Sequence, residues 1–155
     1  MHKKQYMERF IMQDLIAWKN RKDRKPLILL GARQVGKTYI LKEFGQREFE
    51  NVAYINCDNN AMAKDLFASD YNIDRILLTI GAITGVNIEA GKTLIIMDEI
   101  QELHRGLASL KYFCENAREY HVAVAGSLLG LALHQGESYP VGKVNTLEMY
   151  PMTFE

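Results

Sequence analysis

The first hydrophobic positions of the chain follow the spacing of an amphipathic helix. Within residues 4–19, the apolar side chains that would share one helix face are Met7, Ile11, Leu15 and Trp18. The charged run KNRKDRK, residues 19–25, comes next and is typical of a solvated connector. We therefore treat residues 1–25 as an N-terminal helix with its connector, and residues 26–155 as the main domain.

Beyond the connector, short apolar runs alternate with segments of helical spacing. The apolar runs predict buried strands at 26–31, 52–57, 93–97 and 121–127, and a fifth strand is expected at 143–149. The intervening segments predict helices at 37–44 (ending before Gly45), from the cluster at 58–60 through 67, at 73–83 (ending at Gly85), at 103–117, and directly after Ser127. Strands that alternate with helices predict an α/β fold, with a mostly parallel five-stranded sheet covered on both faces.

Composition and charge narrow the class of protein without naming a function. The chain has 155 residues, which fits one domain, and 48% of them are hydrophobic. Nineteen basic residues balance nineteen acidic ones, so no overall charge favours nucleic acid or an anionic membrane. No signal peptide is visible, and the apolar runs are far shorter than the ~20 residues that span a bilayer. We expect a cytoplasmic protein in which Cys57 and Cys114 stay reduced and buried.

A glycine-rich segment, GARQVGKT, follows the first predicted strand. It matches G-x-x-x-x-G-K-[ST] in full, and the residues expected to contact phosphate are Gly31, Ala32, Arg33, Gln34, Val35, Gly36, Lys37, Thr38 and Tyr39. Glycines let backbone N–H groups close around phosphate oxygens, and the following helix adds its positive N-terminal end. Lys37 would reach the β- and γ-phosphates, while the Thr38 hydroxyl would bind Mg²⁺. An incidental glycine-rich turn is the alternative, but the position between a strand and a helix favours the phosphate site.

Two acidic residues end the third predicted strand, TLIIMDE. Asp98 is expected at the carboxyl edge of the sheet, where open α/β sheets bind ligands, and would hold Mg²⁺ through water. Glu99, one residue further on, is placed to act as general base on an attacking water. This second carboxylate favours ATP hydrolysis over a switch GTPase, and no guanine-reading N-K-x-D follows the phosphate motif.

Several other polar residues keep two interpretations. Ser127 either directs its hydroxyl at the γ-phosphate and water, or caps the helix that would start at Leu128. Tyr39 either contacts the nucleotide or packs on the first helix. His104 and His121 are expected to face solvent rather than to bind a metal.

The motifs together resemble those of the prokaryotic AAA-superfamily ATP-binding proteins. The resemblance rests on GARQVGKT, TLIIMDEIQEL, VAVAGSLL and the end of the chain, PVGK…LEMYPMTFE, and it covers nearly the whole chain in order. It implies a P-loop NTPase three-layer sandwich, in which the strand that ends at Ser127 separates those of Gly31 and Asp98. It also favours a sensor role for Ser127 and suggests that Gln101 senses the γ-phosphate. In this family a winged-helix segment and a C-terminal domain, often likened to nucleases, usually follow.

Two departures from the family pattern bear on function. The family commonly has Gly-Arg where this chain has Gly142-Lys143, and lysine cannot reproduce the planar fork of arginine. The chain also ends on the apolar stretch PMTFE, so we expect that a further domain or a protein partner receives the conformational change. A homo-oligomer is also compatible with the sequence.

Three functions follow, and the first is favoured. An Mg²⁺-dependent ATPase would use Lys37, Glu99 and Ser127 in catalysis and Thr38 and Asp98 for the metal. A nucleotide-dependent switch with negligible hydrolysis would bind ATP tightly without turnover. A small-molecule kinase is disfavoured, because the segment after the fourth strand, residues 128–143, contains no arginine for a lid.

Overall fold

The computed structural model describes residues 2–31, 36–127 and 140–149. The helices are α1 (His2–Lys19), α2 (Lys37–Glu48), α3 (Ile73–Thr84) and α4 (Ser109–Asn116), with short 3₁₀ turns η1 (Cys57–Asn59) and η2 (Ile100–Glu102). The strands are β1 (Leu27–Gly31), β2 (Asn51–Asn56), β3 (Thr93–Asp98), β4 (His121–Ala125) and β5 (Asn145–Met149). The helix expected directly after Ser127 lies outside the described residues.

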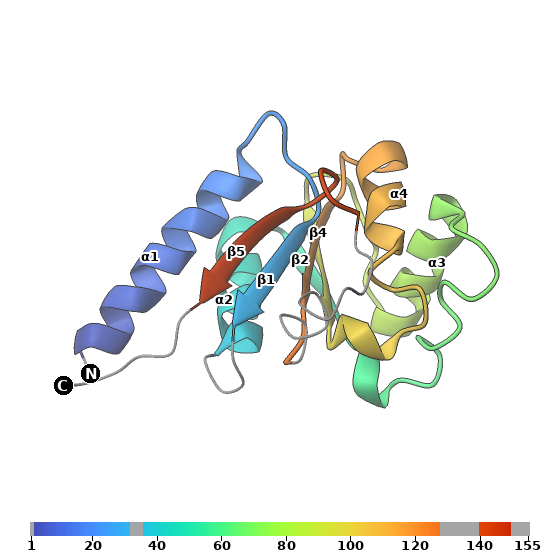
Figure 1. The fold of residues 1–155 in the computed structure, drawn as a ribbon, viewed down its shortest axis with the longest axis horizontal. Helices are drawn as coiled ribbons and strands as arrows, with labels where there is room; N and C mark the ends of the chain where they lie inside the picture. Colours follow the sequence, from blue (N-terminus) through green and yellow to red (C-terminus); the bar gives the residue numbers. More distant parts are fainter. Residues whose placement is uncertain (1, 32–35, 128–139, 150–155) are drawn as a thin grey trace.

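The five strands form one parallel sheet in the order β2-β3-β4-β1-β5 (Figure 1). β4 therefore lies between β1 and β3, which confirms the strand order implied by the family resemblance. The helices make two outer layers, with α1 and α2 on one face of the sheet and α3 and α4 on the other (Figure 1). The fold is the α/β three-layer sandwich that the sequence predicts.

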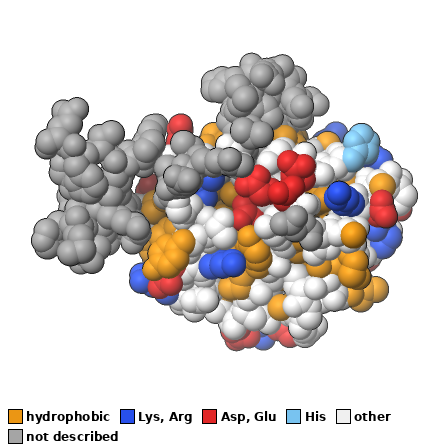
Figure 2. Space-filling view, turned by 90° about the horizontal axis from the view of Figure 1, so that it is seen from below, with side chains coloured by type: hydrophobic (Ala, Val, Ile, Leu, Met, Phe, Trp, Pro, Cys, Tyr) orange, Lys and Arg blue, Asp and Glu red, His pale blue; other side chains and the backbone are white. Residues whose placement is uncertain are grey.

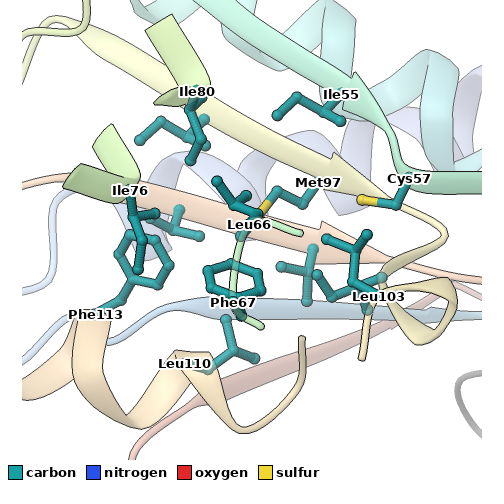
Figure 3. Close-up of a cluster of buried hydrophobic side chains, with 14 of the residues drawn as sticks. Ile55, Cys57, Leu66, Phe67, Ile76, Ile80, Met97, Leu103, Leu110 and Phe113 are labelled. Carbon is teal, nitrogen blue, oxygen red and sulfur yellow. The ribbon is translucent and has the colours of Figure 1, made fainter. Parts of the chain in front are cut away.

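Alternate residues of the central strands enter two separate cores. On β3, Leu94 and Ile96 pack with α1 and α2, whereas Ile95 and Met97 pack with α3 and α4. Every residue of β3 and β4 is buried, as expected for the middle of a parallel sheet. Figure 3 shows the second core, in which Phe67 and Phe113 meet side chains from the strands. The N-terminal helix joins the first core through Met12, Leu15 and Trp18.

Gly45 does not end α2, contrary to the sequence prediction. The helix continues to Glu48, and Gly45 is buried where α2 crosses β2 and β3. A Cβ atom at this position would lie 2.5 Å from Val52 Cγ2 and 3.2 Å from Leu94 Cδ2. The glycine therefore allows the helix and the sheet to approach closely. This packing explains why a glycine stands inside the helix, where it is otherwise unfavourable.

The helix expected at 103–117 is shorter than predicted. Residues 100–102 form η2, turns follow, and α4 begins only at Ser109. Arg105 has a left-handed backbone, with φ of 65°, and a Cβ on Gly106 would lie 2.8 Å from the Ile100 carbonyl oxygen. This tight backbone turn interrupts the helix, although Leu103 and Leu107 are still buried. The short helix expected through residue 67 is likewise replaced by η1 and turns.

His121 is buried, so the expectation that it faces solvent is wrong, whereas His104 is exposed. The His121 ring packs edge-on against Trp18 and Phe49, with ring centroids 5.8 and 5.0 Å away. Burial, together with the charge of Arg24, lowers the pKa of His121 to about 4. Cys57 and Cys114 are free and buried, as expected. Of the helices that the structure describes, none has the length and apolar character needed to cross a membrane.

Candidate functional site

The predicted phosphate loop starts and ends at the carboxyl edge of the sheet. Gly31 closes β1, and Gly36 precedes the first turn of α2 with φ of 87° and ψ of 26°. An added Cβ at Gly36 would meet no neighbour, so glycine is favoured there by the left-handed backbone alone. Residues 32–35, which include Ala32, Arg33, Gln34 and Val35, lie outside the described residues. The structure thus places the N-terminus of the 12-residue α2 beside the ends of β1 and β4.

The side chain of Lys37 bridges the ends of two strands. Its Nζ donates hydrogen bonds to the carbonyl oxygens of Gly31 and Gly126, and the side chain is almost fully buried. Burial lowers the pKa of Lys37, while the carboxylates of Glu99 and Asp98 act in the opposite direction. A buried cation is therefore fixed between β1 and β4, close to two carboxylates.

Thr38 and Asp98 are joined directly. The Thr38 hydroxyl donates to Asp98 Oδ2 at 2.5 Å, and the backbone N–H of Glu99 donates to Asp98 Oδ1 at 3.0 Å. Asp98 is only 6% exposed, yet it forms no ion pair within the part of the chain that the structure describes. A buried carboxylate beside a hydroxyl is an oxygen donor pair that fits Mg²⁺.

A metal at this position would need ligands beyond the Thr38–Asp98 pair. The described residues include no cluster of three or more His, Cys, Asp or Glu side chains that could hold a metal. Mg²⁺ is commonly bound by one or two protein oxygens together with water and substrate phosphates, so the Thr38–Asp98 pair fits that mode. The space-filling view from the side on which the strands end shows acidic side chains gathered near the middle of this face (Figure 2).

The carboxylate of Glu99 accepts two hydrogen bonds from Ser127, and its backbone conformation is unusual. Its backbone is left-handed, with φ of 56° and ψ of 45°, an uncommon conformation for a residue other than glycine. The backbone N–H of Ser127 donates to Glu99 Oε1 at 3.2 Å, and the Ser127 hydroxyl donates to Oε2 at 3.1 Å. Strained backbone of this kind is found preferentially at functional sites. The structure thus brings Glu99 and Ser127 together at the ends of β3 and β4.

Gln101 also contacts the carboxylate of Glu99. Its Nε2 donates to Glu99 Oε2 at 2.5 Å, while its Oε1 is buried and has no hydrogen-bond partner among the residues that the structure describes. This oxygen is an acceptor that a water or another donor could use. Tyr39 differs from the other residues expected here, because its side chain is 59% exposed and is not buried against α1.

Tyr54 belongs to the same cluster, although the sequence analysis did not select it. The Tyr54 hydroxyl donates to Asp98 Oδ2 at 2.8 Å, the oxygen that also accepts from Thr38. Burial and this hydrogen bond raise the pKa of Tyr54, so the phenol remains protonated. A tyrosine inside an otherwise apolar strand was the available signal, since a buried phenol needs a hydrogen-bond partner. The partner emerges only from the pairing of β2 with β3.

Lys143, at the position where the family commonly has arginine, is far from this cluster. β5 runs parallel to β1, with Asn145 opposite Leu27 and Met149 opposite Gly31. Lys143 precedes β5 at the amino edge of the sheet, about 20 Å from the phosphate loop at the usual rise of a strand. Its Nζ lies 3.4 Å from a carboxylate oxygen of Glu115. Within one chain, Lys143 therefore does not line the site.

Comparisons with known proteins bear on the family and the fold. A family model described as an AAA domain matches residues 23–155. Among solved structures, the chain is similar to the Aeropyrum pernix ORC1 protein in complex with DNA, with a TM-score of 0.54, 17% identity, and coverage of 96% of this chain and 45% of that chain. It is also similar to the P-loop NTPase domain of the sigma-54 transport activator from E. coli, with a TM-score of 0.48, 16% identity, and coverage of 96% and 94%.

The two structural matches concern the fold of the chain. The chain spans less than half of the ORC1 protein, and at such low identity the likeness concerns the fold alone. No curated protein matches the chain.

Proposed function

The chain belongs to the family of AAA domains, a P-loop NTPase type, and on that premise we propose that it binds Mg²⁺-ATP and hydrolyses it to ADP and phosphate. The observation that carries this proposal is the meeting of Lys37, Thr38, Asp98 and Glu99 at one edge of the sheet. A cation, a metal-binding pair and a second carboxylate are what attack of water on a γ-phosphate requires. The proposed nucleotide site lies at the carboxyl ends of β1, β3 and β4.

Phosphate would be bound by the start of α2 and by Lys37. The first backbone N–H groups of a helix have no partner within the helix, and they carry its positive end. Lys37 Nζ already lies between Gly31 and Gly126, so the ammonium group would contact the terminal phosphates with little movement. Residues 32–35 would complete the backbone ring around the phosphates.

The proposed metal ligands are prepared by the hydrogen bond between Thr38 and Asp98. Because the Thr38 hydroxyl donates its hydrogen bond to Asp98, its oxygen lone pairs remain available for a cation. Asp98 would contact the metal through water. When bound, Mg²⁺ would neutralise charge on the β- and γ-phosphates during transfer to water.

Glu99 is the proposed general base, and Ser127 the residue that positions it. The carboxylate would accept a proton from the attacking water, while the Ser127 hydroxyl would hold Glu99 Oε2 and face the γ-phosphate. Both carboxylate oxygens already accept hydrogen bonds from Ser127 and Gln101. Oε1 accepts one of these hydrogen bonds and Oε2 two, so Oε1 can still accept from an attacking water. We expect slow turnover by the isolated chain, because Lys143 stands where the family commonly has arginine and does not line the site.

This arrangement also favours a second candidate, a nucleotide-dependent switch with negligible hydrolysis. If Ser127 and Gln101 keep the Glu99 carboxylate away from the attacking water when ATP is bound, the domain would hold ATP without hydrolysing it. It would then signal to a neighbouring domain or a partner protein. In either case we propose that nucleotide state controls a conformational change outside this chain.

The test measures ATP affinity and phosphate release for the parent chain, Glu99→Gln and Lys37→Ala. We expect Glu99→Gln to retain ATP binding and lose hydrolysis, and Lys37→Ala to lose binding. Glu102→Gln and Lys64→Ala are matched controls, since both side chains are exposed on neighbouring surface segments. Equal turnover in Glu99→Gln and the parent would remove the general-base role. Tight ATP binding with negligible turnover in the parent would favour the switch.

A further inference from the structure

Tyr54 connects the candidate metal-binding pair to the edge strand of the sheet. β2 is the outer strand next to β3, and Tyr54 lies two residues before the end of β2, in register with Ile96. Side chains of alternate residues share a sheet face, so Tyr54 and Asp98 both point to the face covered by α2. The phenol therefore reaches Asp98 across the strand pair.

The hydrogen-bond arrangement around Asp98 leaves the carboxylate one orientation. Oδ2 accepts from both Thr38 and Tyr54, at 2.5 and 2.8 Å, while Oδ1 accepts from the backbone N–H of Glu99. The phenol approaches from β2 and the threonine from α2, so the two donors hold Oδ2 from different elements. Hydrogen bonds to a charged acceptor are among the strong ones, and they fix its geometry.

The ammonium group of Lys42 lies over the Tyr54 ring. Its Nζ lies 3.9 Å from the ring centroid, a cation–π distance. Lys42 follows Thr38 by four residues, so one face of α2 presents a hydroxyl to Asp98 and an ammonium group to Tyr54. Thr38 and Tyr54 thus contact Asp98 directly, and Lys42 contacts the Tyr54 ring; these side chains come from α2 and β2.

We propose that Tyr54 is a positioning residue for Mg²⁺, because it holds the Asp98 carboxylate in the orientation that the metal requires. The inference rests on the proposed function, in which Thr38 and Asp98 bind the metal. Outer hydrogen-bond partners of metal ligands typically contribute about 10- to 100-fold to metal affinity. The phenol also interacts with Thr38, the other proposed metal ligand, so we expect the effect of Tyr54 to fall on the metal.

The experiment titrates Mg²⁺ against the affinity for a fluorescent ADP analogue, in the parent and in Tyr54→Phe. Removal of the phenol oxygen keeps the ring and its contact with Lys42. We expect the Mg²⁺ concentration at half-effect to rise by about 10-fold or more, with nucleotide affinity in EDTA unchanged. Tyr112→Phe, in the opposite helix layer, is the matched control and should behave as the parent.

A second variant tests whether Tyr54 acts through Asp98. Asp98→Asn removes the charged acceptor, so adding Tyr54→Phe to it should cause little further change in Mg²⁺ dependence. An unchanged Mg²⁺ dependence in Tyr54→Phe, additive effects in the double variant, or an equal loss of affinity in EDTA would each overturn the inference. If the parent itself binds no nucleotide, the proposed function fails instead. Thermal unfolding of each variant confirms that the fold persists.

Discussion

Ser127 holds the carboxylate of Glu99 at two points, through its backbone N–H to Oε1 and through its hydroxyl to Oε2. This contact joins the end of β3 to the end of β4, the strand that lies next to β1 and the candidate phosphate position. Because the hydroxyl can rotate while the backbone N–H cannot, the two hydrogen bonds differ in how readily they exchange for a phosphate oxygen or a water. The hydroxyl is therefore the element of this contact that nucleotide would change.

Substitution of Ser127 by alanine should lower turnover without weakening ATP binding. The variant keeps the backbone hydrogen bond but loses the side-chain donor, so Glu99 is less well oriented toward water. We expect kcat to fall by roughly 10-fold or more, the usual contribution of a group that assists proton transfer. Ser127→Thr, which keeps a hydroxyl, is the control and should stay near the parent. Steady-state phosphate release measures the effect, and a change in KM alone would contradict the assignment.

Alanine at Gly45 should destabilise the fold. The added Cβ would lie 2.5 Å from Val52 Cγ2, and overpacking of this kind typically costs about 1–3 kcal/mol, against a gain of about 1 kcal/mol in helix propensity. We expect a net loss of up to about 2 kcal/mol in urea unfolding. Combining Gly45→Ala with Val52→Ala makes room for the methyl group, so the combined loss should be less than the sum of the two single losses. Gln46→Ala, on the exposed side of α2, is the control; strict additivity would speak against the packing explanation.

His121 should make stability depend on pH between about 6.5 and 4. Its folded-state pKa lies below its unfolded value, so the unfolded chain binds more protons in this range and stability falls as the pH is lowered. The slope from one group is at most about 1.4 kcal/mol per pH unit. Urea unfolding at pH 7.5 and pH 5 measures it. His121→Phe should flatten the dependence, whereas exposed His104→Gln should not; an unchanged slope in His121→Phe would assign it to other groups.

Replacement of Lys143 should leave nucleotide binding by a single chain unaffected. The side chain lies at the amino edge of the sheet and is 41% exposed in its ion pair with Glu115, and exposed pairs contribute about 0–1 kcal/mol. We expect Lys143→Ala to change ATP affinity less than twofold and stability by under about 1 kcal/mol. Lys143→Arg is the conservative control. A marked loss of ATP affinity in a monomeric sample would contradict the strand register from which this follows.

The sequence predicted the strands, most of the helices and the positions of most candidate site residues, because these depend on local patterns. Continuous apolar runs and helical spacing are properties of single segments, and the phosphate motif is contiguous. What the sequence could not supply depends on contacts between segments. Gly45 was expected to follow the end of a helix. The sequence could not show that it lies inside α2, because its close contact with Val52 and Leu94 is tertiary. His121 starts a strand, and only the packing of α1 and the chain near Phe49 buries it.

Tyr54 illustrates the same limit within the site. Its partner Asp98 is 44 residues away, and the two meet only because β2 pairs with β3 in one particular register. The pairing of Glu99 with Ser127 likewise required the strand order, which came from a family resemblance rather than from any pattern in the residues. Sequence patterns therefore placed the polar residues on their strands, and the pairing of the strands determines which side chains meet.

The anchoring of α2 at both ends has a mechanical consequence. Thr38 ties its first turn to Asp98, and Gly45 seats its later turns against Val52 and Leu94, so helix and β3 form a single stiff unit. In the proposed function, we therefore expect α2 and β3 to move together when the γ-phosphate is lost. We expect the first change between strands at the ends of β3 and β4, because the hydrogen bonds that join Glu99 and Ser127 there can exchange.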